Sequence, residues 1–254
     1  MGTVHTPAAQ NLQWLAHRAR PHFFGFKLKG GILKGLHTYK HIIWDWNGTL
    51  LDDCWLCLDI MNELLRKRDR ASITHETYQA IFGFPIIDYY KKVGFNFVQE
   101  PFESVAIEFI EIYHARSGEC TLQPDAREVL DACRGLGLRQ SVLSAMEQSY
   151  LSQMVRALDL ENCFETLIGL NDHYASGKTE NGRTHLRKLG IAAKDVLFIG
   201  DTLHDFEVAS VMGTDCILVA NGHHSRERLS TTGATVLNSL REILPENEHV
   251  FSNR

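Results

Sequence analysis

The chain has 254 residues, of which 44% are hydrophobic and 22% charged, and these proportions exclude a disordered or fibrous protein. Its net charge of −5 argues against nucleic-acid binding, which needs a basic surface. The sequence has no apolar run near the roughly 18 residues that span a bilayer, no apolar block typical of a secretory signal, and six scattered cysteines, so we expect a cytoplasmic protein without an integral membrane segment.

The N-terminal part of the chain differs in charge from the rest. Residues 1–44 contain six basic residues and no acid, so they carry +6, and the net charge of −5 leaves −11 for the remainder. We interpret residues 1–37 as a basic N-terminal extension that docks on the acidic body or has little structure of its own. An amphipathic arm for a membrane surface or an anionic ligand is the alternative.

Beyond residue 40, short apolar runs alternate with helical patterns. The expected strands are 41–45, 138–144, 166–170, 195–200 and 215–220. Helical patterns cover 124–136, which places Val129 and Cys133 on one face, and 205–212, which follows the fourth of these strands. Alternating strands and helices predict an α/β protein with a parallel sheet covered on both faces.

A different pattern lies between the first and second of these strands. Residues 54–117 contain several amphipathic helical patterns and no convincing strand, which predicts a helical insertion. Because ligands bind at the carboxyl ends of strands in open α/β sheets, an insertion at this point would lie above the site as a lid. In the stretch 81–92, Gly83 and Pro85 interrupt the helical pattern, which indicates either a loop turned toward the site or simple structural punctuation.

Polar residues end several of the expected strands. Asp45 closes the first, Ser144 the second and Asp201 the fourth, with Asp205 four residues further on, and Lys178 follows the third strand. Carboxyl ends of parallel strands cluster, so we expect these side chains to meet in one crevice. Two or three carboxylates beside a lysine suit Mg²⁺, which prefers oxygen ligands and keeps positions for water or a phosphate. The sequence therefore predicts a Mg²⁺ site that accepts a phosphorylated small molecule.

Four short segments, in order, carry a family resemblance: DWNGTLLDD, SVLSA, SGKTE and LFIGDTLHD. They resemble the four motifs of the haloacid dehalogenase superfamily over residues 38–245, and the insertion resembles the cap of its phosphoglycolate-phosphatase-like branch. The resemblance implies a Rossmann-like doubly wound parallel sheet with an inserted α-helical cap domain. The division that follows is a catalytic core (38–53 and 121–254) and a cap (54–120). The implied activity is that of a Mg²⁺-dependent phosphatase acting on a small phosphorylated metabolite.

The same resemblance assigns roles to the matching residues. Asp45 matches the nucleophile that forms an aspartyl-phosphate. Ser144 matches a hydroxyl that hydrogen-bonds a phosphoryl oxygen, and Lys178 matches the cation that stabilises the transferring group. Asp201 matches a direct Mg²⁺ ligand, and Asp205 matches a residue that orients a metal-bound water or the lysine. Helix capping is the alternative for the serine and for the last aspartate.

Asn47 departs from the family pattern. Family phosphatases usually have an aspartate here, which protonates the leaving oxygen and then activates water, whereas an asparagine cannot exchange a proton in that way. General acid–base help is worth about 10²–10⁴ in rate. The family's metal ligand at this position is the backbone carbonyl, which the substitution retains. The site is therefore expected to bind Mg²⁺ and phosphate and to be handicapped at turnover.

Three functions are compatible with Asn47. The first is a phosphatase that prefers leaving groups of low pKa, such as acyl phosphates, anhydrides or aryl phosphates. The second is a phosphotransferase, in which a persistent aspartyl-phosphate passes its group to an acceptor hydroxyl. The third is a regulatory module that senses phosphate and Mg²⁺ with little turnover. Retention of Lys178, Asp201 and Asp205 together favours the first.

Two other groups of residues attract attention without a clear role. Cys54 and Cys57 lie in a helical pattern with no second ligand pair, so we expect neither zinc binding nor redox chemistry there. His223 and His224 follow the fifth expected strand, near enough to the edge of the site to touch a ligand, and we expect them to be surface residues without a role, which is the more common case for adjacent histidines.

Overall fold

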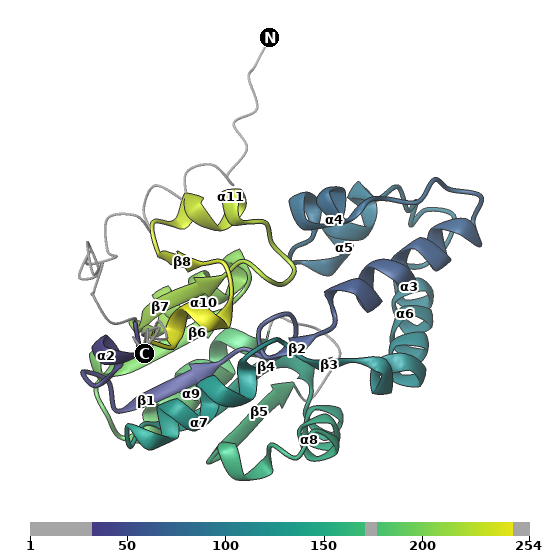
Figure 1. Cartoon of the computed structure of the whole chain (residues 1–254). Coiled ribbons are helices and arrows are strands. Elements are labelled where there is room, and N and C mark those ends of the chain that lie inside the picture. Colours follow the sequence, from purple (N-terminus) through teal and green to yellow (C-terminus); the bar gives the residue numbers. More distant parts are fainter. Residues whose placement is uncertain (1–31, 171–176, 246–254) are drawn as a thin grey trace, which may run out of the picture.

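The computed structural model describes residues 32–170 and 177–245, and a parallel sheet forms its centre. The strands are β1 His41–Trp44, β4 Arg139–Glu147, β5 Thr166–Leu170, β6 Val196–Gly200, β7 Asp215–Val219 and β8 Thr235–Leu237. These six strands follow the order β5–β4–β1–β6–β7–β8, and every neighbouring pair is parallel (Figure 1). The first strand of the chain is thus central, so the residue that follows it lies among neighbouring strand ends.

Helices cover both faces of the sheet. On one face Ile43 and Phe198 are fully buried in a cluster with residues of α9 (Lys178–Leu189) and α10 (Leu203–Met212). On the other face Ile42 and Trp44 are buried with residues of α7 (Ala126–Gly135). Successive strand residues point to opposite faces, so the apolar run of β1 supplies both cores. The predicted doubly wound parallel α/β fold is confirmed.

A helical insertion separates β1 from β4. Its helices are α3 Cys54–Arg66, α4 His75–Ile81, α5 Ile86–Lys92 and α6 Phe102–Arg116. They form a separate layer beyond the end of the sheet (Figure 1), and α3 packs against α6. The chain enters through β2 (Leu51–Asp52) and returns through β3 (Thr121–Leu122), which pair with each other in antiparallel orientation. The expected helical insertion after the first strand is confirmed.

The remaining helices are short or lie at the edges. They are α2 Leu33–Leu36, α8 Gln148–Ala157, α11 Arg226–Leu229 and the 3₁₀ helices Ser117–Glu119, Glu161–Cys163, Ala193–Asp195, Ser230–Thr232 and Leu240–Ile243. Both α9 and α10 end at glycines in the left-handed region, Gly190 and Gly213, where a side chain would be strained.

The structure differs from the expected elements in three places. Strands β2, β3 and β8 were not predicted, because runs of two or three residues are too short for an alternation pattern. Strand β4 continues to Glu147, three residues beyond the expected end. The stretch 81–92 is mostly helical, and the interruption by Gly83 and Pro85 is limited to the connection between α4 and α5.

The basic N-terminal extension lies largely outside the described residues, because only residues 32–37 of it belong to the described range. Its docking therefore stays a prediction. Within the described part of the chain, no helix is long and apolar enough to cross a membrane.

Candidate active site

Four charged side chains from separate segments meet at the carboxyl end of the sheet. Asp45 directly follows β1, and its amide donates to the carbonyl of Ile199 at 2.8 Å, which holds it at the end of the central strand. Asp201 directly follows β6, and Asp205 lies in the first turn of α10. Carboxylate oxygens of these three aspartates lie within 4.8 Å of one another. Lys178, the first residue of α9, joins them from the neighbouring helix.

The ammonium of Lys178 connects two of the carboxylates. Its Nζ atom donates to Oδ1 of Asp45 at 2.5 Å and to Oδ1 of Asp205 at 2.6 Å, and its side chain is only 4% exposed. Burial disfavours the charge, but the two carboxylates outweigh it and raise the pKa of Lys178 above its ordinary value. The lysine is therefore a fixed cation beside the carboxylate of Asp45.

The two carboxylate oxygens of Asp205 accept hydrogen bonds from different residues. Oδ1 accepts from Lys178, while Oδ2 accepts from the amide and hydroxyl of Thr202 at 2.9 and 2.6 Å. The hydroxyl of Thr202 in turn accepts from the Asp205 amide, so the pair forms a capping box at the start of α10. Capping and contact with the lysine therefore occur together at this residue, and both its oxygens already have donors.

Thr49 and the loop after β7 hold the remaining carboxylate oxygens. The hydroxyl of Thr49 lies 3.1 Å from Oδ2 of Asp45 and 2.9 Å from Oδ1 of Asp201. The amide of His223 donates to Oδ2 of Asp201 at 2.6 Å. A Cβ atom on Gly222 would lie 2.1 Å from this same oxygen, so only glycine allows the loop to approach the carboxylate so closely.

The donor set of this cluster fits a divalent cation. Three carboxylates and one ammonium leave the cluster with an excess of negative charge in a buried position. Burial, followed by the charge of Asp205, raises the pKa of Asp45, and burial also raises the pKa of Asp201. A hard cation such as Mg²⁺ would offset the cost of ionising both groups. Asp45 and Asp201 are the residues that could hold it, and Asp205 is placed to orient Lys178.

Asn47 and Ser144 lie together beside the cluster. The hydroxyl of Ser144 is 3.3 Å from Oδ1 of Asn47 and also accepts from the amide of Met146 at 3.0 Å. The amide nitrogen of Asn47 donates to Oδ2 of Asp53 at 2.7 Å and lies 3.0 Å from the hydroxyl of Tyr113. Both predicted residues are thus at the site, and the asparagine is bound to a carboxylate that the sequence analysis did not assign.

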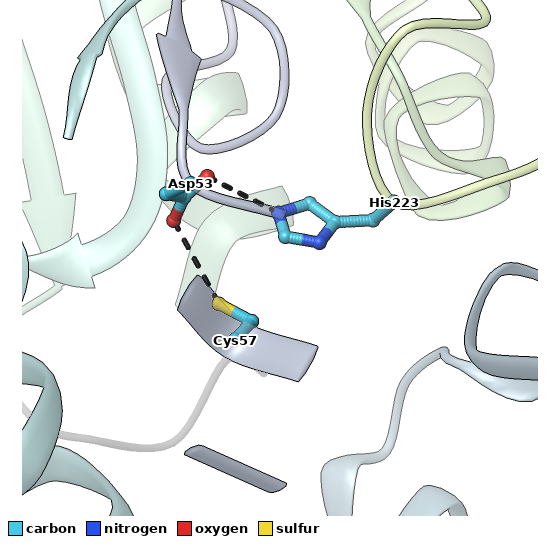
Figure 2. Close-up of side chains that lie close together, drawn as sticks. All are labelled: Asp53, Cys57 and His223. Carbon is cyan, nitrogen blue, oxygen red and sulfur yellow. Dashed lines mark hydrogen bonds and ion pairs between the residues drawn. The ribbon is translucent and has the colours of Figure 1, made fainter. Parts of the chain in front are cut away.

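Asp53 is completely buried and receives donors on both oxygens. Its Oδ1 accepts from the amide of Gly48 at 2.8 Å, and its Oδ2 accepts from Asn47 and from the Tyr113 hydroxyl at 2.8 Å. The imidazole of His223 approaches Oδ1 at 3.5 Å (Figure 2). Burial alone would raise the pKa of Asp53, but these partners, His223 foremost, hold it below its ordinary value. An aspartate that stays ionised is a poor proton donor, so Asp53 does not replace the acid missing at position 47.

His223 and His224 are buried, which corrects the expectation that they are surface residues. His223 shares a hydrogen bond with the hydroxyl of Tyr78, and its contact with Asp53 raises the pKa of the imidazole against the effect of burial. His224 accepts from the amide of Leu203 and contacts the carbonyl of Phe82, and burial lowers its pKa to about 3. The loop packs inward because the α4–α5 region of the insertion covers it.

Asp53, Cys57 and His223 are close enough to hold a metal ion (Figure 2). Their contacts favour a different explanation. Both oxygens of Asp53 already accept hydrogen bonds, and burial raises the pKa of the Cys57 thiol well above its ordinary value, which keeps it protonated. Cys54 and Cys57 are free thiols. The cluster is therefore best described as a buried ion pair that connects the loop after β7 with the start of the insertion.

Replacing Asp53 by asparagine is expected to lower the free energy of unfolding by about 3–5 kcal/mol, because it leaves the His223 imidazolium buried without a counter-ion. Urea denaturation at pH 7 measures the change. Asp52→Asn is the matched control, since this neighbour is only partly buried and should change stability by less than about 1 kcal/mol. Equal small losses in both variants would contradict the ion pair.

A cavity of about 830 Å³ opens from the cluster toward the insertion. Asp45, Asn47 and Lys178 line one end, and aromatic side chains of the insertion line much of the rest. The site thus combines a charged floor at the sheet with a partly open cavity large enough for a small organic molecule.

Asp53, Thr49 and Tyr113 are the residues of this region that the sequence analysis missed. Asp53 belongs to the acidic pair that ends the DWNGTLLDD segment, which was a usable signal. Thr49 lies in the same segment, so the same signal was available for it. Tyr113 carried none, because a tyrosine on an amphipathic helix is common without any role at a site.

Comparison with known proteins is consistent with this geometry. Residues 42–219 match the family described as haloacid dehalogenase-like hydrolase. The phosphoglycolate phosphatase of Colwellia psychrerythraea is 22% identical over 218 residues, which cover 78% of this chain and 92% of that protein. The phosphoglycolate phosphatase of Nitrosospira multiformis is 25% identical over 193 residues, which cover 73% and 85%.

Solved structures show the same fold. A haloacid dehalogenase-like hydrolase from Streptococcus pneumoniae superposes with a TM-score of 0.72 at 17% identity, covering 81% of this chain and 97% of the other. A predicted phosphoglycolate phosphatase from Haemophilus somnus has a TM-score of 0.65 at 17% identity and covers 81% and 96%.

Proposed function

Because this chain belongs to the haloacid dehalogenase-like hydrolases, we propose that it is a Mg²⁺-dependent phosphatase that hydrolyses a small phosphorylated metabolite through an aspartyl-phosphate on Asp45. The observation that carries the proposal is the buried contact of Lys178 with Asp45 and Asp205 at the floor of a cavity. A lysine held against a carboxylate at the floor of a cavity is suited to phosphoryl transfer.

In the first half of the reaction, a carboxylate oxygen of Asp45 attacks phosphorus, and the bond between phosphorus and the leaving oxygen breaks with its electron pair on that oxygen. Lys178 stabilises the charge that spreads over the phosphoryl oxygens, and the hydroxyl of Ser144 is placed to donate to one of them. Mg²⁺, when bound, would neutralise further negative charge on the phosphoryl group. Asp201 would hold this ion with Asp45.

In the second half, water attacks phosphorus, the bond to Asp45 breaks with its electron pair on the carboxylate, and a proton of the water passes to a phosphoryl oxygen, so that hydrogen phosphate is released. Asn47 is hydrogen-bonded to the ionised Asp53 and cannot exchange a proton in either half of the reaction. Its Oδ1 atom can accept a hydrogen bond from the incoming water. A leaving group that departs without protonation is therefore expected to react fastest.

Assays with and without divalent cation test this proposal. Purified protein should release phosphate from acetyl phosphate and phenyl phosphate in the presence of Mg²⁺, and chelation should reduce turnover by about 10³-fold or more, since the cation contributes several kcal/mol of charge stabilisation. Mg²⁺ alone should also raise the melting temperature, because it offsets the crowded carboxylates. Unchanged turnover after chelation, or no turnover of any phosphorylated compound, would overturn the proposal.

A further inference from the structure

The cavity above Asp45 has an aromatic wall. The insertion supplies Phe82, Phe84, Tyr89, Tyr90, Phe102 and Phe109 to its lining. Several of these rings pack edge to face, as Phe82 and Tyr89 do with centroids 5.2 Å apart. The wall is therefore a surface of aromatic rings packed against one another. Such a surface favours contact with a flat apolar group.

The same cavity offers little to a second anionic group. Among its described lining residues, Lys178 is the only lysine or arginine, and it is bound to Asp45 and Asp205. Arg228 lies close by, but its guanidinium donates to the carbonyls of Gln79 and Phe82 on the insertion and does not line the cavity. A carboxylate on the substrate, as in phosphoglycolate, would therefore lie against rings and acidic side chains, because the His223 imidazolium, which also lines the cavity, is already paired with Asp53.

Asn47 restricts the leaving group independently. With an asparagine at this position, no side chain there can protonate the leaving oxygen, so we expect that oxygen to depart as an anion. A phenolic oxygen can do this because the ring delocalises the charge, whereas an alkoxide cannot. The aromatic wall and the missing acid thus both favour a phenolic leaving group.

We propose that the substrate is an aryl phosphate, the phosphate ester of a phenol or of a larger fused-ring phenol, whose ring fills the cavity. This inference rests on the proposed function. Phosphorus lies at Asp45 and Lys178, and the ring lies against the wall of the insertion.

Four esters separate ring size, leaving-group acidity and anionic charge. Phenyl and 2-naphthyl phosphate have leaving groups of similar acidity but different size, benzyl phosphate keeps a ring with an alkoxide leaving group, and phosphoglycolate is small and anionic. We expect kcat/KM to be about tenfold higher for the naphthyl than for the phenyl ester, and at least about 10²-fold higher for the phenyl ester than for the other two. Equal or better hydrolysis of phosphoglycolate would overturn the aryl proposal and leave the phosphatase intact.

Filling the cavity provides the second test. Ala106→Phe, on the cavity side of α6, should raise KM for 2-naphthyl phosphate about tenfold more than it raises KM for acetyl phosphate, because the acetyl group does not reach the wall. Ala115→Phe is the matched control, since Ala115 is exposed on the same helix and lies outside the lining, and it should change neither. Unchanged KM for the naphthyl ester in Ala106→Phe would contradict the placement of the ring.

A binding measurement distinguishes failure of the aryl-phosphate proposal from failure of the phosphatase proposal. With Mg²⁺ present, calorimetry should show that 2-naphthylmethylphosphonate binds at least tenfold more tightly than phosphonoacetate. If no ester is hydrolysed but this preference is found, the phosphatase proposal falls and the aryl site stands. If hydrolysis occurs and phosphonoacetate binds as tightly, the aryl site falls and the phosphatase stands.

Discussion

Replacing Asp45 with asparagine is expected to reduce turnover of every phosphorylated substrate by about 10⁴-fold or more, because a carboxamide is not a nucleophile toward phosphorus. The geometry should survive, since the amide oxygen of the new residue can still accept from Lys178 in place of Oδ1, which lies 2.5 Å from its Nζ atom. Phosphate release from acetyl phosphate and phenyl phosphate measures the loss. Mass spectrometry of quenched reactions should show phosphorylation at Asp45 in the original protein only.

The stability of Asp45→Asn toward urea distinguishes loss of the nucleophile from misfolding. Burial raises the pKa of Asp45, so the folded protein carries a cost for ionising this group at neutral pH, and the uncharged variant lacks that cost. We therefore expect Asp45→Asn to unfold at the same or higher urea concentration than the original protein in the absence of metal. Asp195→Asn, at the opposite end of β6, is the control and should retain full activity. Turnover above about 1% in Asp45→Asn would place the nucleophile elsewhere.

Restoring a carboxylate at position 47 is expected to raise hydrolysis of alkyl phosphates by about 10²–10⁴-fold, the usual contribution of a general acid. In the single variant Asn47→Asp, the new carboxylate lies next to that of Asp53. The amide nitrogen of Asn47 that it replaces lies 2.7 Å from Oδ2 of Asp53. Two buried carboxylates at that distance must share a proton or repel each other. The double variant Asn47→Asp with Asp53→Asn keeps one carboxylate and one amide in the pair, so it should show the larger gain per folded molecule. Because Asp53→Asn also removes the counter-ion of His223, the assay is made under conditions in which urea denaturation shows the double variant to be folded.

The comparison uses methyl phosphate as the alkyl ester and acetyl phosphate as the compound that needs no acid. Turnover of acetyl phosphate should stay within about threefold in both variants, since its leaving group departs unprotonated. Asn96→Asp, in an exposed part of the insertion, controls for the added charge. A gain that is equal for both compounds, or absent in the double variant, would refute the explanation of Asn47.

Local patterns were sufficient for five of the six strands of the sheet and for most residues of the charged cluster. Each of the five expected strands is an apolar run long enough to detect, and the topology of parallel strands requires their carboxyl ends to cluster. Asp45, Asp201 and Lys178 were therefore recognisable from their positions after strands and from the four motifs. Strand β8 was missed because three residues carry no periodicity.

The contacts that depend on the insertion could not be inferred from the sequence. Nothing local indicates that Tyr113 on α6 reaches Asp53, or that Tyr78 on α4 reaches His223 in the loop after β7. These contacts depend on how one layer of helices sits over the sheet, which is a property of tertiary packing. The histidines were predicted at the surface for the same reason, since the loop alone gives no sign of what covers it.

The paired strands β2 and β3 bring the two ends of the insertion to one place, with Asp52 opposite Thr121. Changes in the length or composition of the helices between them need not displace the strand ends that carry Asp45 and Asp201, because both junctions are tied to each other. Insertions of different length and composition can therefore be carried at this point of the fold while Asp45 and Asp201 keep their positions. Grafting a foreign insertion between these two junctions would be the corresponding route to redesigning selectivity.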